Sequence, residues 1–220
     1  MKKLFLFLGL MAAAANFAQN NDSMVSLDSI YRTNFLDGVF ETKEDFVKGR
    51  RKNYEIYPKA FRKDERYKDG PVADPGNTVV FRYKSNDKIV HDVFAVSYNG
   101  FLYFEAGSIV VDLNRKDRFQ GGGRNFDFVR ALIGGQNYIY AESDFADTFE
   151  MAGVMQAGGT HTSLLRNKGF VWDFWKHEFN IFRQCKDFNA FISEKNPEGV
   201  QNCEQRLDLL SVRRAIEKIK

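Results

Sequence analysis

Cysteine and histidine are scarce in this chain, which limits its redox and metal chemistry. The 220 residues include only two cysteines, Cys185 and Cys203, and three histidines. The cysteines are too far apart for the C-x-x-C pair of a thioredoxin-like centre, and two cysteines do not supply the four ligands of a structural zinc site. The sequence therefore predicts no redox-active thiol pair and no zinc module, and we expect no metal ion or cofactor.

A hydrophobic run long enough to cross a membrane is also missing. The apolar run near the start covers residues 4–15, which is shorter than the roughly 20 residues that a spanning helix needs. It follows Lys2 and Lys3 and precedes small residues that end at Ala18, the pattern of a cleavable signal peptide. We therefore expect residues 1–18 to be a signal peptide, and the mature chain to be exported, in the periplasm or outside the cell, without a membrane span.

An excess of one charge is absent once the signal peptide is removed. Its two lysines leave 30 basic residues against 29 acidic ones, so the formal net charge falls from +3 to +1. Residues 43–68 are locally basic and rich in tyrosine, but acidic residues are mixed among them. A solvated edge strand or loop is the preferred interpretation of this segment, and nucleic acid is not an expected partner.

The expected compartment indicates the role of the two cysteines. In an oxidising environment an even cysteine count favours a disulfide, and the Asn196–Gly199 turn signal between Cys185 and Cys203 would bring them together. Closing a loop of this length is worth about 3 kcal/mol in the chain-entropy treatment. We therefore predict a structural Cys185–Cys203 disulfide.

Strand signals dominate the middle of the chain. Residues 88–98 and 101–113 are β-branched and aromatic runs separated by Asn99-Gly100, a strong hairpin signal, and residues 108–113 read as a further strand. Other predicted strands cover residues 77–83 and 137–143, and a hairpin over residues 167–183 is expected to turn near Lys176 and His177. The predicted fold class is α+β, with a predominantly antiparallel β body over residues 19–184 and a disulfide-closed helical segment over residues 185–220 that packs on the same domain.

Helices are predicted at three places. Thr42 is a helix cap that Asp45 reciprocates, with Gly49 at the helix end. A second helix is expected from Ser143 to about residue 157. In the third, Asp208 is the cap of a C-terminal helix whose apolar stripe needs a sheet face to cover; the stripe consists of Leu209, Val212, Ile216 and Ile219.

Catalytic motifs are hard to find. His91 and Asp92 are neighbours in a predicted strand, so their side chains are expected on opposite faces. His161 lies near Ser163, but no G-x-S-x-G motif frames any serine, and His177 lies at the expected hairpin turn. Residues 119–128 contain three consecutive glycines without a phosphate-binding motif, and we interpret them as a loop that carries Arg124.

The aromatic residues near the second hairpin pose the main question about binding. Phe170, Trp172 and Phe174 alternate on one strand face, and Trp175 falls on the other. The preferred interpretation is that they form the core. If they are exposed instead, Trp172 and Trp175, with Arg124, are the candidate ligand-binding residues for a sugar or a peptide.

The chain resembles a group of bacterial proteins through four segments. These are the lysine-led signal ending in "FAQ", "LDGVFETKEDF", the "VFAVSYNGFLYF" hairpin and the C-terminal "LLSVRRAIEKIK". Together they resemble the small exported proteins of unknown function, with signal peptides, that are typical of Bacteroidetes. The resemblance implies export and implies no reaction and no catalytic residue.

Two main functions remain for this sequence. The leading hypothesis is a non-enzymatic binding protein of the periplasm or envelope, with a protein, peptide or glycan partner. The alternative is a hydrolase acting on envelope or nutrient polymers, which requires a histidine in a cleft within reach of a carboxylate or serine. A purely structural or assembly role is a third hypothesis.

Overall fold

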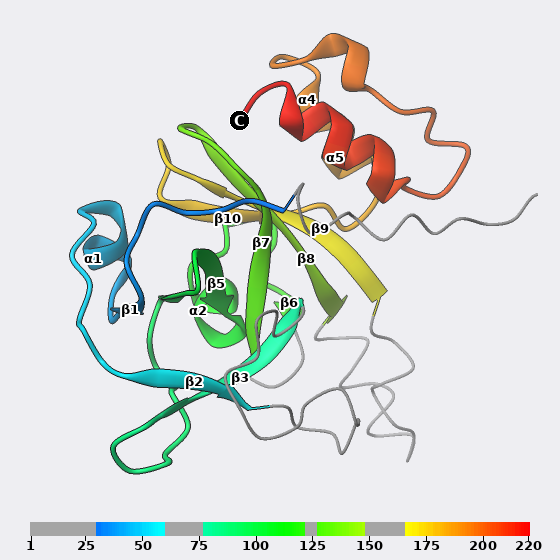
Figure 1. Ribbon diagram of the computed structural model, residues 1–220. Coiled ribbons are helices and arrows are strands. Elements are labelled where there is room, and N and C mark those ends of the chain that lie inside the picture. Colours follow the sequence, from blue (N-terminus) through cyan, green and yellow to red (C-terminus); the bar gives the residue numbers. More distant parts are fainter. Residues whose placement is uncertain (1–29, 60–76, 122–126, 148–165) are drawn as a thin grey trace, which may run out of the picture.

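The described part of the protein is built around one curled antiparallel β-sheet. The computed structural model describes residues 30–59, 77–121, 127–147 and 166–220. Ten strands of these residues form a single sheet, and two helices of the C-terminal segment, coloured orange and red in Figure 1, lie together outside it. The predicted β-rich α+β class is confirmed, whereas residues 1–18, the expected signal peptide, lie outside the described residues.

The strands are short, except for β8 and β9. They are β1 (Gly38–Phe40), β2 (Ile56–Lys59), β3 (Thr78–Tyr83), β4 (Ala95–Tyr98), β5 (Phe101–Glu105), β6 (Gln120–Gly121), β7 (Phe128–Gly134), β8 (Tyr138–Asp147), β9 (Arg166–Asp173) and β10 (Glu178–Ile181). The helices are α1 (Lys43–Val47), α2 (Ala106–Val111), α4 (Cys185–Ile192), the 3-10 turn η3 (Pro197–Gly199) and α5 (Leu209–Glu217).

The sheet follows the order β1-β4-β5-β7-β8-β9-β10, with β2 and β3 attached to β7 through β3 and with β6 paired to β8. The β4–β5 hairpin turns at Asn99 and Gly100, whose φ angles of 50° and 75° are the positive values that a type I′ turn requires. The β9–β10 hairpin turns at His177, which also has a positive φ. Both predicted hairpins are therefore confirmed.

Aromatic side chains fill the interior of the curled sheet. The fully buried rings are Phe40, Phe46, Phe94, Phe104, Phe145, Phe170, Trp172 and Phe179. Phe46 reaches them from α1, where the backbone N–H of Asp45 donates to Thr42 Oγ1 at 3.1 Å and the Thr42 hydroxyl donates to Asp45 Oδ2 at 2.9 Å. The predicted cap thus holds the short helix that closes one end of the sheet.

A second apolar cluster lies between the β2–β3 hairpin and the outer face of β4, β5 and β7. Its large members include Phe81, Tyr103 and Phe128; the Phe81 ring lies 5.2 Å from Tyr103 and 5.3 Å from Phe128 in edge-to-face contacts. Because β2 and β3 cover this face, both surfaces of the central strands are buried, and their sequences do not alternate between polar and apolar residues.

The C-terminal segment packs on the outer face of β7, β8 and β9. Val212 and Ile216 of α5 are buried there with Phe188 of α4, and the Asp208 carboxylate accepts the backbone N–H groups of Leu210 and Ser211. The predicted cap is therefore confirmed, and the predicted stripe is confirmed for Val212, Ile216 and the partly buried Ile219, whereas Leu209 is half-buried and lies outside this apolar cluster.

The predicted disulfide between Cys185 and Cys203 is present, with Cα atoms 5.4 Å apart. Between the two cysteines, Gly199 of η3 lies against α5, where a Cβ atom at this position would stand 2.7 Å from Ala215 Cβ. The segment between the cysteines therefore forms a closed helix-turn unit that packs against the last helix.

Two predictions of secondary structure were wrong, and one strand was missed. Residues 108–113 were expected as a strand, but residues 106–111 form helix α2, which buries Ile109 and exposes Val111 to solvent. Ser143 was expected to cap a helix, but β8 continues through it to Asp147 and buries Phe145. The remainder of that expected helix lies outside the described residues, and the central strand β7 had not been predicted at all.

Candidate functional site

The described residues line several hollows, and one of them lies beside the disulfide. This disulfide pocket has a volume of about 480 Å³. Its lining residues are Arg166, Asn167, Lys168, Phe182, Arg183, Gln184, Cys185, Lys186, Cys203, Gln205, Arg206, Leu207 and Leu209. They come from three segments: the start of β9, the connection from β10 into α4, and the loop that leads into α5.

Local interactions fix the walls of the disulfide pocket. After β10 ends, the Phe182 N–H donates to Gly169 O at 2.9 Å, and the disulfide then joins the start of α4 to the loop at Cys203. The same loop is held by Gln201, whose backbone N–H donates to Asn189 Oδ1 at 2.9 Å and whose side-chain amide bonds the backbone N–H and C=O of Asp208. These hydrogen bonds and the disulfide therefore link the segments that line the pocket.

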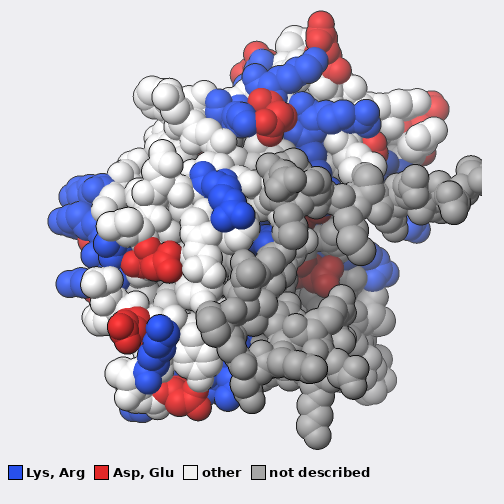
Figure 2. Space-filling view, in the orientation of Figure 1, with Lys and Arg blue, Asp and Glu red and all other residues white. Residues whose placement is uncertain are grey.

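All the charged residues in the lining of the disulfide pocket are basic. The lining contains five Lys or Arg residues and no Asp or Glu, although acidic and basic side chains are interspersed over the described face shown in Figure 2. Arg183 is partly neutralised, because its Nε lies 3.2 Å from Asp117 and 3.1 Å from Asp187. Lys186 and Arg206, in contrast, form no ion pair with any described residue and are exposed. Both of these cations are therefore accessible to a ligand.

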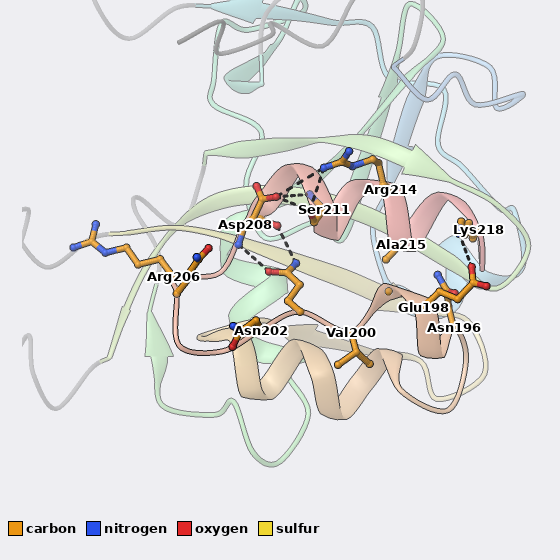
Figure 3. Close-up of a pocket in the computed structure, with 13 residues that line it drawn as sticks. Asn196, Glu198, Val200, Asn202, Arg206, Asp208, Ser211, Arg214, Ala215 and Lys218 are labelled. Carbon is orange, nitrogen blue, oxygen red and sulfur yellow. Dashed lines mark hydrogen bonds and ion pairs between the residues drawn. The ribbon is translucent and has the colours of Figure 1, made fainter. Parts of the chain in front are cut away.

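A second hollow, of about 360 Å³, lies between η3, the loop after it and α5 (Figure 3). Apart from Arg206, which also lines the disulfide pocket, its charged groups largely pair with one another. Ser211 Oγ donates to Asp208 Oδ2 at 2.5 Å, Arg214 donates to Ser211 at 3.1 Å, and Lys218 lies 3.1 Å from Glu198. These contacts hold the loop on the helix, so we assign this hollow a structural role.

The third hollow is larger, about 640 Å³, and is called the His91 pocket here. It lies between the segment before β4 and helix α2; its lining residues are His91, Asp92, Glu105, Gly107, Ser108, Val110 and Val111. The expectation that His91 and Asp92 point apart was wrong, because His91 Nδ1 lies 2.7 Å from Asp92 Oδ2. These two residues precede β4, and the positive φ of Asp92 removes the strand alternation on which the expectation depended.

Glu105 is a buried residue in the lining of the His91 pocket. Its carboxylate accepts the backbone N–H groups of Asp92 at 2.8 Å and of Val93 at 3.1 Å, and Ser108 Oγ donates to Val93 O at 2.7 Å. Burial raises the pKa of Glu105 to about 7, although the two backbone N–H groups favour the ionised form. Glu105 therefore ties the segment before β4 to the start of α2.

The raised pKa of Glu105 predicts a pH dependence of stability. The folded chain holds this proton more tightly than the unfolded chain, so the stabilisation is complete below the unfolded pKa near 4.5 and is lost as pH rises through about 7. The free energy of unfolding should therefore fall by about 3 kcal/mol from this group between about pH 4 and pH 8. Urea unfolding across this range should show a shallower decline in Glu105→Gln than in the wild type.

The exposed Glu194→Gln provides the control for this measurement. It removes a carboxyl group outside the three hollows and should keep the wild-type decline. Equal declines in the wild type and Glu105→Gln would contradict the assignment of the pH dependence to Glu105.

The candidate ligand-binding residues from the sequence are not brought together. Trp172 is fully buried, so its assignment as a ligand contact was wrong and its interpretation as core is confirmed. Trp175 is 80% exposed at the β9–β10 turn, where its Nε1–H donates to Asn137 Oδ1 at 3.3 Å. Arg124 and His161 lie outside the described residues. His177 is exposed, and its ring stacks beside that of Trp172, with the ring centroids 6.3 Å apart.

The described residues show neither a metal centre nor a membrane-spanning helix. No group of three or more His, Cys, Asp or Glu side chains in them is arranged to hold a metal ion. No helix in the same ranges combines the length and the apolar composition that crossing a membrane requires. Sequence reasoning missed the disulfide pocket because its cations are spread over three segments; only the predicted disulfide indicated that two of these meet.

Comparisons with protein-family models, with curated proteins and with solved structures give no match to this chain. The site must therefore be interpreted from its own geometry and charge.

Proposed function

We propose that the protein is an exported, non-enzymatic binding protein that holds an anionic group of its partner in the disulfide pocket. The single observation that carries this proposal is a lining with five cations and no acid, in a chain whose overall charge is nearly balanced. Support for export comes from the signal-peptide pattern of residues 1–18 and from the disulfide.

The chemistry of the pocket suits carboxylate or other oxyanion groups. Arg206 and Arg166 supply planar guanidinium groups, which bind carboxylates through two parallel hydrogen bonds, and Lys186 supplies a point charge. The volume lies within the range of ordinary ligand pockets. A free cation at such a site attracts anions over about a Debye length and so also raises the association rate.

Reversing the charges of Lys186 and Arg206, the two cations that form no ion pair with a described residue, should abolish this attraction. We expect Lys186→Glu/Arg206→Glu to weaken binding of polyglutamate or polygalacturonate by at least about tenfold at low ionic strength, since it replaces attraction by repulsion. Fluorescence anisotropy with labelled polymers measures the dissociation constant, and added salt should weaken binding to the wild type.

The matched control is Lys84→Glu/Lys88→Glu, which makes the same change in net charge at exposed positions outside the three hollows. This variant should retain most of the wild-type affinity. If both double variants lose affinity equally, only the net charge matters and the pocket is not the site. If the wild type binds neither polymer, the proposed function is wrong.

The alternative function, a polymer hydrolase, is favoured by one observation. The His91 pocket brings a histidine within 2.7 Å of a carboxylate and adds a buried carboxyl with a raised pKa, a combination that marks candidate catalytic sites. Binding remains the preferred function because both Glu105 oxygens hold backbone N–H groups and the Ser108 hydroxyl donates to a carbonyl. Turnover of a polymer by the purified chain, lost in Glu105→Gln, would reverse this preference.

A further inference from the structure

We infer that the group held in the disulfide pocket is an acidic peptide segment of another protein, with an aliphatic side chain beside its carboxylates. This inference rests on the proposed function and names the class of partner. It depends on three properties of the same pocket: its apolar surface, its amide side chains, and the absence of an exposed aromatic ring from its lining.

The apolar part of the pocket comes from Leu207, Leu209 and the disulfide itself. Both leucines are half-buried, so they expose some aliphatic surface in the same pocket as the cations. A ligand that bears only charge would leave this surface in water. An aliphatic side chain between two acidic ones would cover it, and removal of that apolar area from water would add to the affinity.

Three amide side chains complete the lining. Asn167, Gln184 and Gln205 are exposed, and each carries both a hydrogen-bond donor and an acceptor. The backbone of a peptide presents the same two kinds of group at every residue, so these amides match a peptide. A fatty acid or a simple anion offers only acceptors at its head group.

The lining offers no aromatic platform for a sugar ring. Its one aromatic residue, Phe182, is only 1% exposed, so the pocket presents no ring face on which a sugar could stack. The exposed indole of Trp175 lies at the β9–β10 turn and is not among the lining residues. The observations therefore favour a peptide over an acidic glycan.

The two cations without ion partners stand on walls that the disulfide joins. Lys186 follows Cys185 at the start of α4, and Arg206 follows Cys203 in the loop before α5. One bound segment can contact both walls, which gives its two carboxylates separate partners. Leu209 lines the same pocket and offers an apolar contact for the aliphatic side chain.

The test uses capped peptides on the full mature chain with its disulfide intact. The probes are Gly-Glu-Leu-Glu-Gly, the same peptide with serine in place of leucine, and trigalacturonate. Amide chemical-shift titrations give each dissociation constant and show whether the signals of Lys186 and Arg206 move. We expect the leucine peptide to bind about tenfold more tightly than the serine peptide, as burial of one aliphatic side chain predicts.

A matched pair of variants locates that preference in the pocket. Leu209→Ser should remove the tenfold difference, whereas Leu210→Ser, the next residue, which is 44% exposed and outside the lining, should preserve it. Far-ultraviolet circular dichroism checks that both variants are folded; if Leu209→Ser is not, Leu207→Ser replaces it.

The outcomes separate the two proposals. If none of the three probes binds, the proposed function fails together with this inference. If the two peptides and trigalacturonate bind equally, or if trigalacturonate binds best, the anion-binding function stands and the peptide inference is overturned. If Leu210→Ser abolishes the preference as Leu209→Ser does, the aliphatic contact lies outside the pocket, which also overturns the inference.

Discussion

Trp172→Ala should lower the free energy of unfolding by about 3–5 kcal/mol, whereas Trp175→Ala should change it by less than about 0.5 kcal/mol. Trp172 has no solvent exposure, and its ring lies 4.9 Å from Phe179, 5.1 Å from Phe94 and 6.1 Å from Phe46. These rings come from β10, the segment before β4, and α1. Truncation would therefore open a cavity where three parts of the chain meet, and urea unfolding would measure its cost.

The two tryptophans also provide a spectroscopic check. In Trp175→Ala the remaining indole is buried, so its emission should shift to the blue; in Trp172→Ala the remaining indole is exposed, so its emission should shift to the red. Equal stability losses in the two variants would contradict the assignment of Trp172 to the core.

Trp172→Phe refines the prediction about the core. Trp172 Nε1 is buried and has no hydrogen-bond partner among the described residues. Because an unpaired buried donor costs about 1–3 kcal/mol, phenylalanine removes this cost while it leaves part of the ring volume empty. We therefore expect Trp172→Phe to cost less than half as much as Trp172→Ala in the same unfolding experiment.

Features that depend on a few neighbouring residues could be predicted from the sequence. The cap at Thr42, the turn at Asn99-Gly100 and the cap at Asp208 are examples, because each involves backbone groups at most three residues away. The disulfide belongs with them, since the number of cysteines and the expected compartment left one pairing. These local features fixed where elements begin and end, but not how they pair.

Features that depend on distant contacts could not be predicted in this way. Ile109 and Val111 lie in a β-branched run that favours a strand, yet α2 buries the first residue in the aromatic interior and exposes the second. Strand β7 is buried on both faces, and its central Arg130 is satisfied by Asn77, whose side-chain oxygen lies 2.6 Å from the guanidinium. No alternation marks such a strand.

The candidate sites also depend on contacts between residues that are distant in the sequence. His91 and Asp92 meet where Asp92 adopts a left-handed backbone, and the Asp92 N–H donates to the carboxylate of Glu105, thirteen residues away. The disulfide pocket gathers its cations from three segments that only the fold brings together. The sequence indicated correctly that Cys185 and Cys203 join a helix to a loop, but the charge of the surface between them became visible only in three dimensions.

Arg213 and Glu142 form the main polar link between α5 and the sheet. Arg213 donates to both carboxylate oxygens of Glu142, at 2.7 Å and 2.6 Å, and the Tyr140 hydroxyl donates to the same carboxylate at 2.6 Å. The Glu142 side chain is only 6% exposed, and hydrogen bonding to it raises the pKa of Arg213. The pair lies beside the apolar cluster that attaches the C-terminal segment.

Arg213→Ala should lower the free energy of unfolding by about 3–5 kcal/mol, because among the described residues it leaves the buried Glu142 carboxylate with only the Tyr140 hydroxyl as its partner. The neighbouring Arg214→Ala is the matched control: the Arg214 side chain is 76% exposed and its guanidinium lies 4.0 Å from Asp208, so its loss should cost less than about 1 kcal/mol. The double variant Arg213→Met/Glu142→Leu should regain most of the stability, since two apolar side chains need no partner. If the double variant is no more stable than Arg213→Ala, the loss reflects packing of the arginine stem rather than an unpaired charge. Urea unfolding of the wild type and the three variants at one pH separates these causes.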